Sequence, residues 1–238
     1  MLDDPSDFEE VLKKAQELGY AERNPAADVE GYDACRKIAI LSSLAYGCHV
    51  DFEDIYTEGI TKITDIDFKY AKKLGLSIKL FGKSKKVDDK CYAMVAPFMI
   101  DSDNPLYSVN GVLNGILVKG DVIGDVMFYG AGAGKLPTAS AVVADIVDSA
   151  IHNERRKLIG WTKPETDTSA DADSKKFRYF IRTSDDKETV KAVFSNVTEI
   201  ECLAQTDFAF ITEPLSVSEL NIEKSKLGGI KTAIRVLD

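Results

Sequence analysis

The side chains best suited to chemistry lie close together near the start of the chain: three acids, Glu22, Asp28 and Asp33, and one base, Lys37. They surround an Asn-Pro pair, which disfavours helix and starts an irregular segment. Neighbouring carboxylates can bind an ammonium group, and a lysine among them can donate or accept a proton when it is partly desolvated. Because a helix N-terminus attracts carboxylate groups, the pattern fits a small zwitterion such as an amino acid.

Two predicted helices flank this segment. Apolar residues recur at helical spacing from Asp7 to Leu18, and again from about Asp33 to Tyr46. Asp33 and Lys37 then lie one turn apart on the same face of the second helix. The alternative explanation is an ordinary helix cap with a solvated ion pair, and the residue types alone leave both explanations open.

The order of residues in this segment resembles the signature of homoserine dehydrogenases. From Ala15 to Lys37 the chain matches, without a gap, the pattern Ala-x3-Gly-Tyr-Ala-Glu-x-Asn-Pro-x2-Asp-Val-x-Gly-x-Asp-x3-Lys. The resemblance continues to about residue 152, through Arg-Lys-Ile-Ala-Ile-Leu from residue 36, Ile-Thr-Lys-Ile-Thr from residue 60, and the glycine-rich run that starts at Tyr129.

The resemblance implies roles for several of these residues. Tyr20, Glu22, Asp28, Asp33 and Lys37 would bind the substrate, with Asp33 and Lys37 as the catalytic pair. The implied reaction is the NAD(P)-dependent interconversion of L-aspartate 4-semialdehyde and L-homoserine, a step in threonine, methionine and isoleucine biosynthesis.

Homoserine dehydrogenases begin with a dinucleotide-binding domain, and no strand with a glycine-rich turn precedes the first predicted helix. We therefore expect this chain to be a C-terminal part of the enzyme, without tight cofactor binding or activity by itself. Two origins are open: an excised piece of the enzyme, or a stand-alone amino-acid-binding regulatory protein that lost redox chemistry.

Composition limits the other classes of function. The chain has 238 residues, is 45% hydrophobic and carries a net charge of −9. The acidic balance argues against nucleic acid or an anionic membrane as a partner, and no apolar run is long enough to cross a membrane. The four cysteines and two histidines are scattered, so we expect no metal site and a cytoplasmic protein with free thiols. Cys35 is interpreted as a packing residue.

The fold class predicted for residues 1–158, taken as the substrate-binding and catalytic domain, is α+β. A helix is expected over residues 65–74, and strands over 76–83, 91–100, 111–118 and 122–129. A hairpin connection at Lys119-Gly120-Asp121 joins the last two strands. The result is a mostly antiparallel sheet with helices on one face.

The segment from Gly130 to Thr138 is rich in glycine but matches neither a phosphate loop nor a Rossmann turn. It serves either tight packing of strand against helix or contact with a ligand at a helix N-terminus. The resemblance favours a cofactor contact at Gly132 and Gly134. A helix from about Thr138 to Asn153 should pack on the dinucleotide-binding domain in a complete enzyme. In this chain we expect it to expose an apolar face that a second copy of the chain can cover.

The C-terminal part has its own predicted arrangement. Residues 159–175 form a polar linker, and residues 176–238 have the order β-α-β-β-α-β of a ferredoxin-like module. In this position the module resembles an ACT regulatory domain, which implies a threonine effector site around Asp185 to Thr189 in a homodimer. The usual Asp-x-Pro-Gly is replaced by Asp186-Lys-Glu-Thr189, so a purely structural, dimer-forming role is the alternative.

Overall fold

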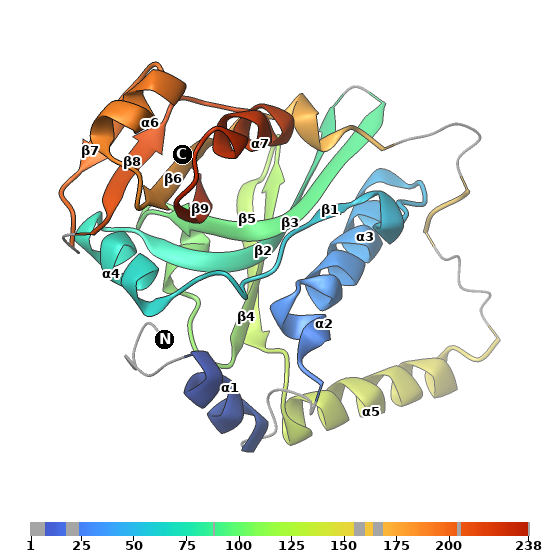
Figure 1. Cartoon of the computed structure of the whole chain (residues 1–238). Coiled ribbons are helices and arrows are strands. Elements are labelled where there is room, and N and C mark those ends of the chain that lie inside the picture. Colours follow the sequence, from blue (N-terminus) through green and yellow to red (C-terminus); the bar gives the residue numbers. More distant parts are fainter. Residues whose placement is uncertain are drawn as a thin grey trace.

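The computed structural model describes residues 8–17, 24–87, 89–154, 160–163, 169–203 and 206–237 (Figure 1). Its centre is a seven-stranded mixed sheet in the order β1-β3-β9-β6-β8-β7, with β2 paired to β3. The strands of this sheet are β1 (Tyr56–Thr57), β2 (Ser77–Val87), β3 (Lys90–Ile100), β6 (Arg178–Thr183), β7 (Val197–Ile200), β8 (Phe208–Thr212) and β9 (Ile230–Val236).

Strand β3 is the centre of the sheet, and its residues from Cys91 to Ile100 are all buried. It pairs with β2 along its whole length on one edge. On the other edge it pairs first with β1, at Met94 and Val95, and then with β9, at Phe98 and Met99. Strand β2 runs antiparallel to β3. The chain reverses direction once between β1 and β2, so β1 lies parallel to β3. The sheet is therefore mixed, and the predicted antiparallel arrangement applies only to its other pairs.

Pro97 lies in the middle of this buried strand, where a proline is normally excluded because it cannot donate a hydrogen bond. Val95 O accepts from Glu58 N at 2.9 Å and Met99 O accepts from Leu237 N at 2.9 Å, so the odd-numbered residues of β3 direct their backbone groups to the β1/β9 edge. Pro97 therefore faces the gap where β1 ends and β9 begins. Its missing N–H group does not remove a hydrogen bond from the paired residues of either strand.

Helices cover both faces of the sheet. Helices α3 (Tyr32–Tyr46) and α4 (Asp65–Lys73) lie on the face of Ala93, Val95 and Met99. Helices α6 (Lys187–Val193) and α7 (Val217–Ser225) cover the opposite face, where they pack with the even-numbered residues of β3. The prediction of helices on one face therefore holds only for the first part of the chain. The C-terminal strands continue the same sheet, and their helices α6 and α7 cover its other face.

Three elements lie outside this sandwich: α1 (Phe8–Glu17), α5 (Lys135–Ile151), and the hairpin of β4 (Leu113–Gly120) with β5 (Gly124–Ala131). In the hairpin Gly120 pairs with Gly124, so the turn falls at residues 121–123, slightly later than predicted. Gly124 adopts φ +77°, which only glycine accepts readily, and this sets where the second strand begins.

The C-terminal elements follow the expected chain order, β6-α6-β7-β8-α7-β9, and their strands are antiparallel in the order β9-β6-β8-β7. The predicted linker includes a 3-10 turn, η3 (Ala172–Ser174), and bridges from Thr162 to Cys48 and from Ser169 to Cys91. The domain limits and the ACT-like character of residues 176–238 stay predictions. No helix in the described ranges has the length and apolarity that a membrane span needs.

A buried ionic cluster joins the two parts of the chain. The guanidinium of Arg182 on β6 donates to Asp67 of α4 at 2.9 Å, to Asp207 at 2.9 Å and to Thr64 at 3.0 Å. Both carboxylates are almost completely buried. Lys231 also bonds to Asp207. These contacts fix α4 against the C-terminal strands.

We expect Arg182→Met to destabilise the chain by about 3–5 kcal/mol, because it leaves buried carboxylates without their main partner. Urea unfolding followed by circular dichroism measures the free energy of unfolding. Lys69→Met is the control, since Lys69 forms an exposed pair with Asp65 at 2.9 Å and should cost less than about 1 kcal/mol. Adding Asp67→Asn and Asp207→Asn to Arg182→Met should recover part of the loss. Equal effects of Arg182→Met and Lys69→Met would contradict this role.

The same cluster predicts a dependence of stability on pH. Burial alone would raise the pKa of Asp207, but hydrogen bonds from Lys231 and Arg182 hold the pKa below its usual range. A carboxyl group whose pKa is depressed by folding contributes stability at pH values above its unfolded pKa of about 3.9, and this stability is lost as the pH falls through its folded pKa. Asp207→Asn should therefore flatten the fall of unfolding free energy below about pH 4. The exposed Asp121→Asn should leave the slope unchanged, and an unaltered slope in both variants would refute the assignment.

Candidate functional site

The segment before α3 is built from a short helix and a tight turn. Helix α2 (Ala26–Val29) follows Pro25, and the side chain of Asn24 accepts a hydrogen bond from Ala26 N at 3.3 Å. Gly31 then adopts φ +81° and is buried against β1 and β3, where an added Cβ would lie 3.1 Å from the side chain of Val95. Glycine is needed here for both its backbone angle and its size. The predicted turn at the Asn-Pro pair thus leads directly into α3.

Asp33 and Lys37 occupy the first turns of α3 and face each other. Lys37 Nζ lies 2.6 Å from Asp33 Oδ2, and the side chains are 67% and 45% exposed. They share one solvent-accessible face of the helix, as the spacing predicted. An exposed pair of this kind adds only about 0.3–0.5 kcal/mol to stability, so it leaves the amine available to a ligand.

The other predicted substrate residues are only partly visible. Asp28 lies on α2, which packs against α3, and it makes an interaction of its own. Tyr20 and Glu22 lie outside the described residues. The structure therefore brings together Asp33 and Lys37, while the convergence of all five side chains stays a prediction.

The loop after β1 holds the α2 turn in place. Ile60 N donates to Val29 O at 2.8 Å. A Cβ added to Gly59 would lie 2.3 Å from Val29 O and 2.5 Å from Glu30 Cα. The two backbones therefore touch, and only glycine permits this approach.

Glu58, next to that glycine, forms an ion pair that sequence reasoning missed. Its carboxylate lies 2.6 Å from the guanidinium of Arg235 on β9, whose side chain is only 2% exposed. The guanidinium also lies over the rings of Tyr56, at 5.1 Å, and Tyr179, at 5.4 Å. Burial opposes the charge on Arg235, but Glu58, together with Tyr179 and Tyr56, stabilises the charged form, and the net effect raises the pKa of the guanidinium. No local pattern links two residues 177 positions apart.

A cavity of about 330 Å³ opens between this loop and α7. Its charged lining residues are Glu30, Glu58, Lys62, Lys224 and Arg235. Burial lowers the pKa of Lys224, although Glu58 acts in the opposite direction. Because Glu30 separates the α2 turn from Gly31, one wall of the cavity adjoins the segment that carries the predicted substrate residues.

Gly132 and Gly134 lie between β5 and α5. An added Cβ at Gly132 would lie 2.4 Å from the side-chain nitrogen of Asn114, so a side chain at residue 132 would have to displace that exposed amide. Gly134 adopts φ +108° immediately before α5, and no side chain caps that helix. Uncapped N–H groups at a helix start can face an anionic ligand, and the cofactor role of these glycines stays a prediction. No cluster of three or more metal-ligating side chains occurs in the part of the chain that the structure describes.

We expect Gly59→Ala to destabilise the chain by about 1–3 kcal/mol, because the added methyl group overlaps the backbone of the α2 turn. Chemical denaturation measures the change. Gly130→Ala is the matched control, since its Cβ would enter open space and should change stability by less than about 0.5 kcal/mol. A Gly59→Ala variant as stable as Gly130→Ala would mean that the close contact is absent in solution.

Comparison with known proteins adds a family to this geometry. A family model described as homoserine dehydrogenase matches residues 1–147. A homoserine dehydrogenase of Helicobacter pylori is 40% identical over 227 residues, covering 95% of this chain and 52% of that protein. One from Synechocystis is 51% identical over 152 residues, covering 62% of this chain and 35% of the relative. The chain thus spans about half or less of these relatives' length.

Solved structures agree along the whole chain. A homoserine dehydrogenase from Thiobacillus denitrificans superposes with a TM-score of 0.86 at 32% identity, covering 100% of this chain and 60% of that one. The Staphylococcus aureus homoserine dehydrogenase at pH 8.5 gives 0.76 at 31% identity, with the same coverage. The family match and the superposition both include the segment that carries Asp33 and Lys37, and the chain belongs to the homoserine dehydrogenase family.

Proposed function

We propose that this chain supplies the substrate-binding and catalytic side chains of an NAD(P)-dependent homoserine dehydrogenase, which interconverts L-homoserine and L-aspartate 4-semialdehyde. The observation that carries the proposal is the Asp33–Lys37 pair, with 2.6 Å between its charged atoms. The pair lies in the first turns of α3, inside the segment that resembles the family signature. Both side chains are accessible, so a substrate can reach them.

The chemistry follows from the pair. Oxidation of homoserine removes a proton from its terminal hydroxyl and a hydride from the adjacent carbon. The nicotinamide cofactor supplies the acceptor for that hydride. Lys37 takes the hydroxyl proton when its amine is neutral and returns it in the reverse direction. Asp33 accepts a hydrogen bond from the lysine and so holds it toward the substrate.

The remaining predicted residues would bind the amino-acid end of the substrate. The carboxylates of Glu22 and Asp28 suit its ammonium group, and Tyr20 would line the pocket. The start of α5 suits the cofactor, because Gly132 and Gly134 carry no side chain and the helix has no side-chain cap. Among the described residues there is no dinucleotide-binding fold of alternating strands and helices, so we infer that this chain alone binds NAD(P) weakly and is inactive.

Surfaces on the outlying elements favour a larger assembly. Helix α5 buries none of its residues, and its exposed apolar side chains are Leu136, Val142, Val143, Ile146, Val147 and Ile151. In the described parts of the chain β4 and β5 pair only with each other, so their outer edges are open. We infer that the rest of the enzyme and a second copy of the chain, in a homodimer, cover these surfaces.

A threonine effector at Asp185 to Thr189 has weaker support. Asp186 caps α6 by accepting a hydrogen bond from Thr189 N at 2.8 Å, and Asp185 accepts one from Gly229 N at 2.9 Å. A threonine ligand would have to compete with these bonds. The alternative function, a stand-alone amino-acid-binding regulatory protein, retains the predicted substrate-binding acids but requires no redox step.

Lys37→Ala, made in an enzyme that joins this chain to a dinucleotide-binding domain, should lower kcat by about 10²–10⁴, the range for a lost general acid or base. Steady-state kinetics with homoserine and NAD(P)⁺ measure it. Lys69→Ala is the matched control, because Lys69 also pairs with an aspartate four residues earlier on an exposed helix face.

A change of less than about threefold in Lys37→Ala would remove Lys37 from proton transfer. The same assay separates the two functions. If the joined enzyme bound homoserine but turned over none, the regulatory alternative would hold and the enzyme proposal would fail.

A further inference from the structure

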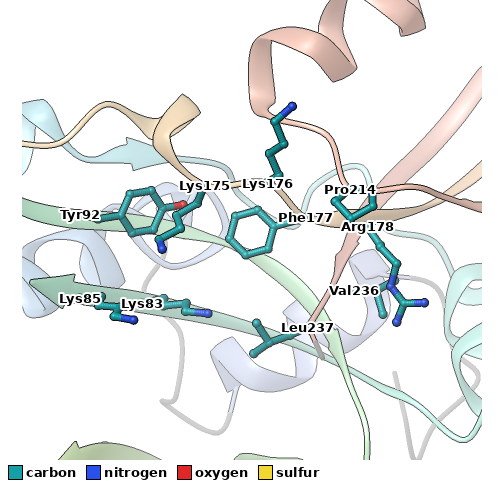
Figure 2. A pocket seen from close by; sticks show the side chains of 10 residues that line it. All are labelled: Lys83, Lys85, Tyr92, Lys175, Lys176, Phe177, Arg178, Pro214, Val236 and Leu237. Atoms are coloured by element: carbon teal, nitrogen blue, oxygen red, sulfur yellow. The ribbon is translucent and has the colours of Figure 1, made fainter. Parts of the chain in front are cut away.

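A second cavity, of about 280 Å³, opens between β2 and the start of β6 (Figure 2). Its charged lining residues are all basic: Lys83, Lys85, Lys175, Lys176 and Arg178. None of its lining residues in the described part of the chain is acidic. This concentration of positive charge is unusual in a chain whose net charge is −9, and it lies away from α3 and the candidate substrate site.

The strand geometry explains why the lysines gather. Lys83 and Lys85 alternate along β2, opposite Met94 and Tyr92 of β3, so both lie on the same face of the sheet. Lys175 follows the turn η3 and lines the same cavity as Tyr92 (Figure 2).

The five cations are not equivalent. Lys176 bonds to Glu219 at 2.6 Å and points away from the other lysines in Figure 2. Arg178 has an interaction of its own. Lys83, Lys85 and Lys175 have no carboxylate partner among the described residues, and they are the cations that remain available to a ligand.

The fold holds these charges together at a cost. Burial lowers the pKa of Lys83, and repulsion from Lys175, Lys119 and Lys85 lowers it further. The ammonium group also lies 5.6 Å from the centre of the Phe177 ring. An anion bound between the three lysines would offset their repulsion.

The size and lining of the cavity indicate the kind of anion. Three ammonium groups offer more hydrogen-bond donors than one carboxylate can use, whereas a phosphate group has enough oxygen atoms for all of them. The remaining wall is apolar and aromatic, formed by Phe177, Pro214, Val236 and Leu237. We propose that this cavity binds the phosphate group of a small phosphorylated molecule through Lys83, Lys85 and Lys175, with its organic part against Phe177 and Leu237.

Calorimetric titration of the chain tests the proposal with inorganic phosphate, adenosine monophosphate and adenosine, all at one ionic strength set with NaCl. We expect the monophosphate to bind and adenosine not to bind. Tighter binding of the monophosphate than of phosphate assigns the site to phosphate esters. Equal affinity for the monophosphate and inorganic phosphate assigns the site to the phosphate ion. That result would overturn the proposed contact of the ligand's organic part with Phe177 and Leu237.

Matched charge changes locate the site. Lys83→Gln with Lys85→Gln should weaken the monophosphate by at least about tenfold, equivalent to about 1.4 kcal/mol. Lys86→Gln with Lys90→Gln removes the same charge from the same hairpin at exposed residues outside the cavity, and should change affinity by less than about twofold at constant salt. Lys175→Gln should also weaken binding of the monophosphate. Because Lys175 lies on a turn, this variant replaces the Lys83→Gln, Lys85→Gln double variant as the test if that double variant does not fold.

A second readout reports on Lys83 itself. Its side-chain pKa, followed by NMR, should rise when the monophosphate binds, because the anion stabilises the charged amine. Equal weakening by both double variants, no heat with either phosphate probe, or an unchanged Lys83 pKa at saturation would each overturn the proposal.

Discussion

The structure depends on the complete burial of β3. A strand that is buried on both faces needs other elements packed against each face. If it is also buried along both edges, each edge needs a neighbouring strand for its backbone hydrogen bonds. The first part of the chain supplies β2 for one edge and α3 and α4 for one face. The other face and half of the second edge are covered by elements after residue 176, so the two parts form one core.

This shared edge gives the candidate site its support. Strands β1 and β9 follow each other along the same edge of β3. The residue after β1, Glu58, therefore lies next to β9 and pairs with Arg235. Gly59 then touches the backbone at Val29 and Glu30, which leads into α3 and its Asp33–Lys37 pair. A continuous series of contacts thus runs from β9 to the candidate catalytic lysine. Contact alone does not make such a series a route for regulation, which would need two alternative arrangements of these elements.

Local patterns were enough to find most elements. Apolar periodicity and glycine stops placed α3 and α4 within one or two residues, and the alternation of residues located the first part of β2. The pairing of Asp33 with Lys37 also followed from helical spacing. These features depend on neighbours in sequence, which is where pattern reasoning is strongest.

Long-range features could not be inferred in this way. The parallel pairs of β3 with β1 and β9 are set by tertiary packing, and the same is true of the Glu58–Arg235 pair and of the Arg182 cluster. The hairpin turn was placed too early because Gly120 and Gly124 are equally good turn residues, and only strand register selects Gly124. The basic cavity was missed because its lysines come from β2 and from a segment interpreted as a linker.

The position of Pro97 also bears on how the chain is made. On the ribosome β3 is complete long before β9, since the polypeptide must first extend from Ile100 to Ile230. At typical elongation rates this delay is about 10 s, during which half of one edge of a strongly apolar strand has no partner. A proline in the middle of that edge interrupts the row of N–H donors on which a neighbouring nascent chain could add a strand. Pro97, which the complete sheet accommodates between β1 and β9, therefore protects the incomplete sheet from aggregation.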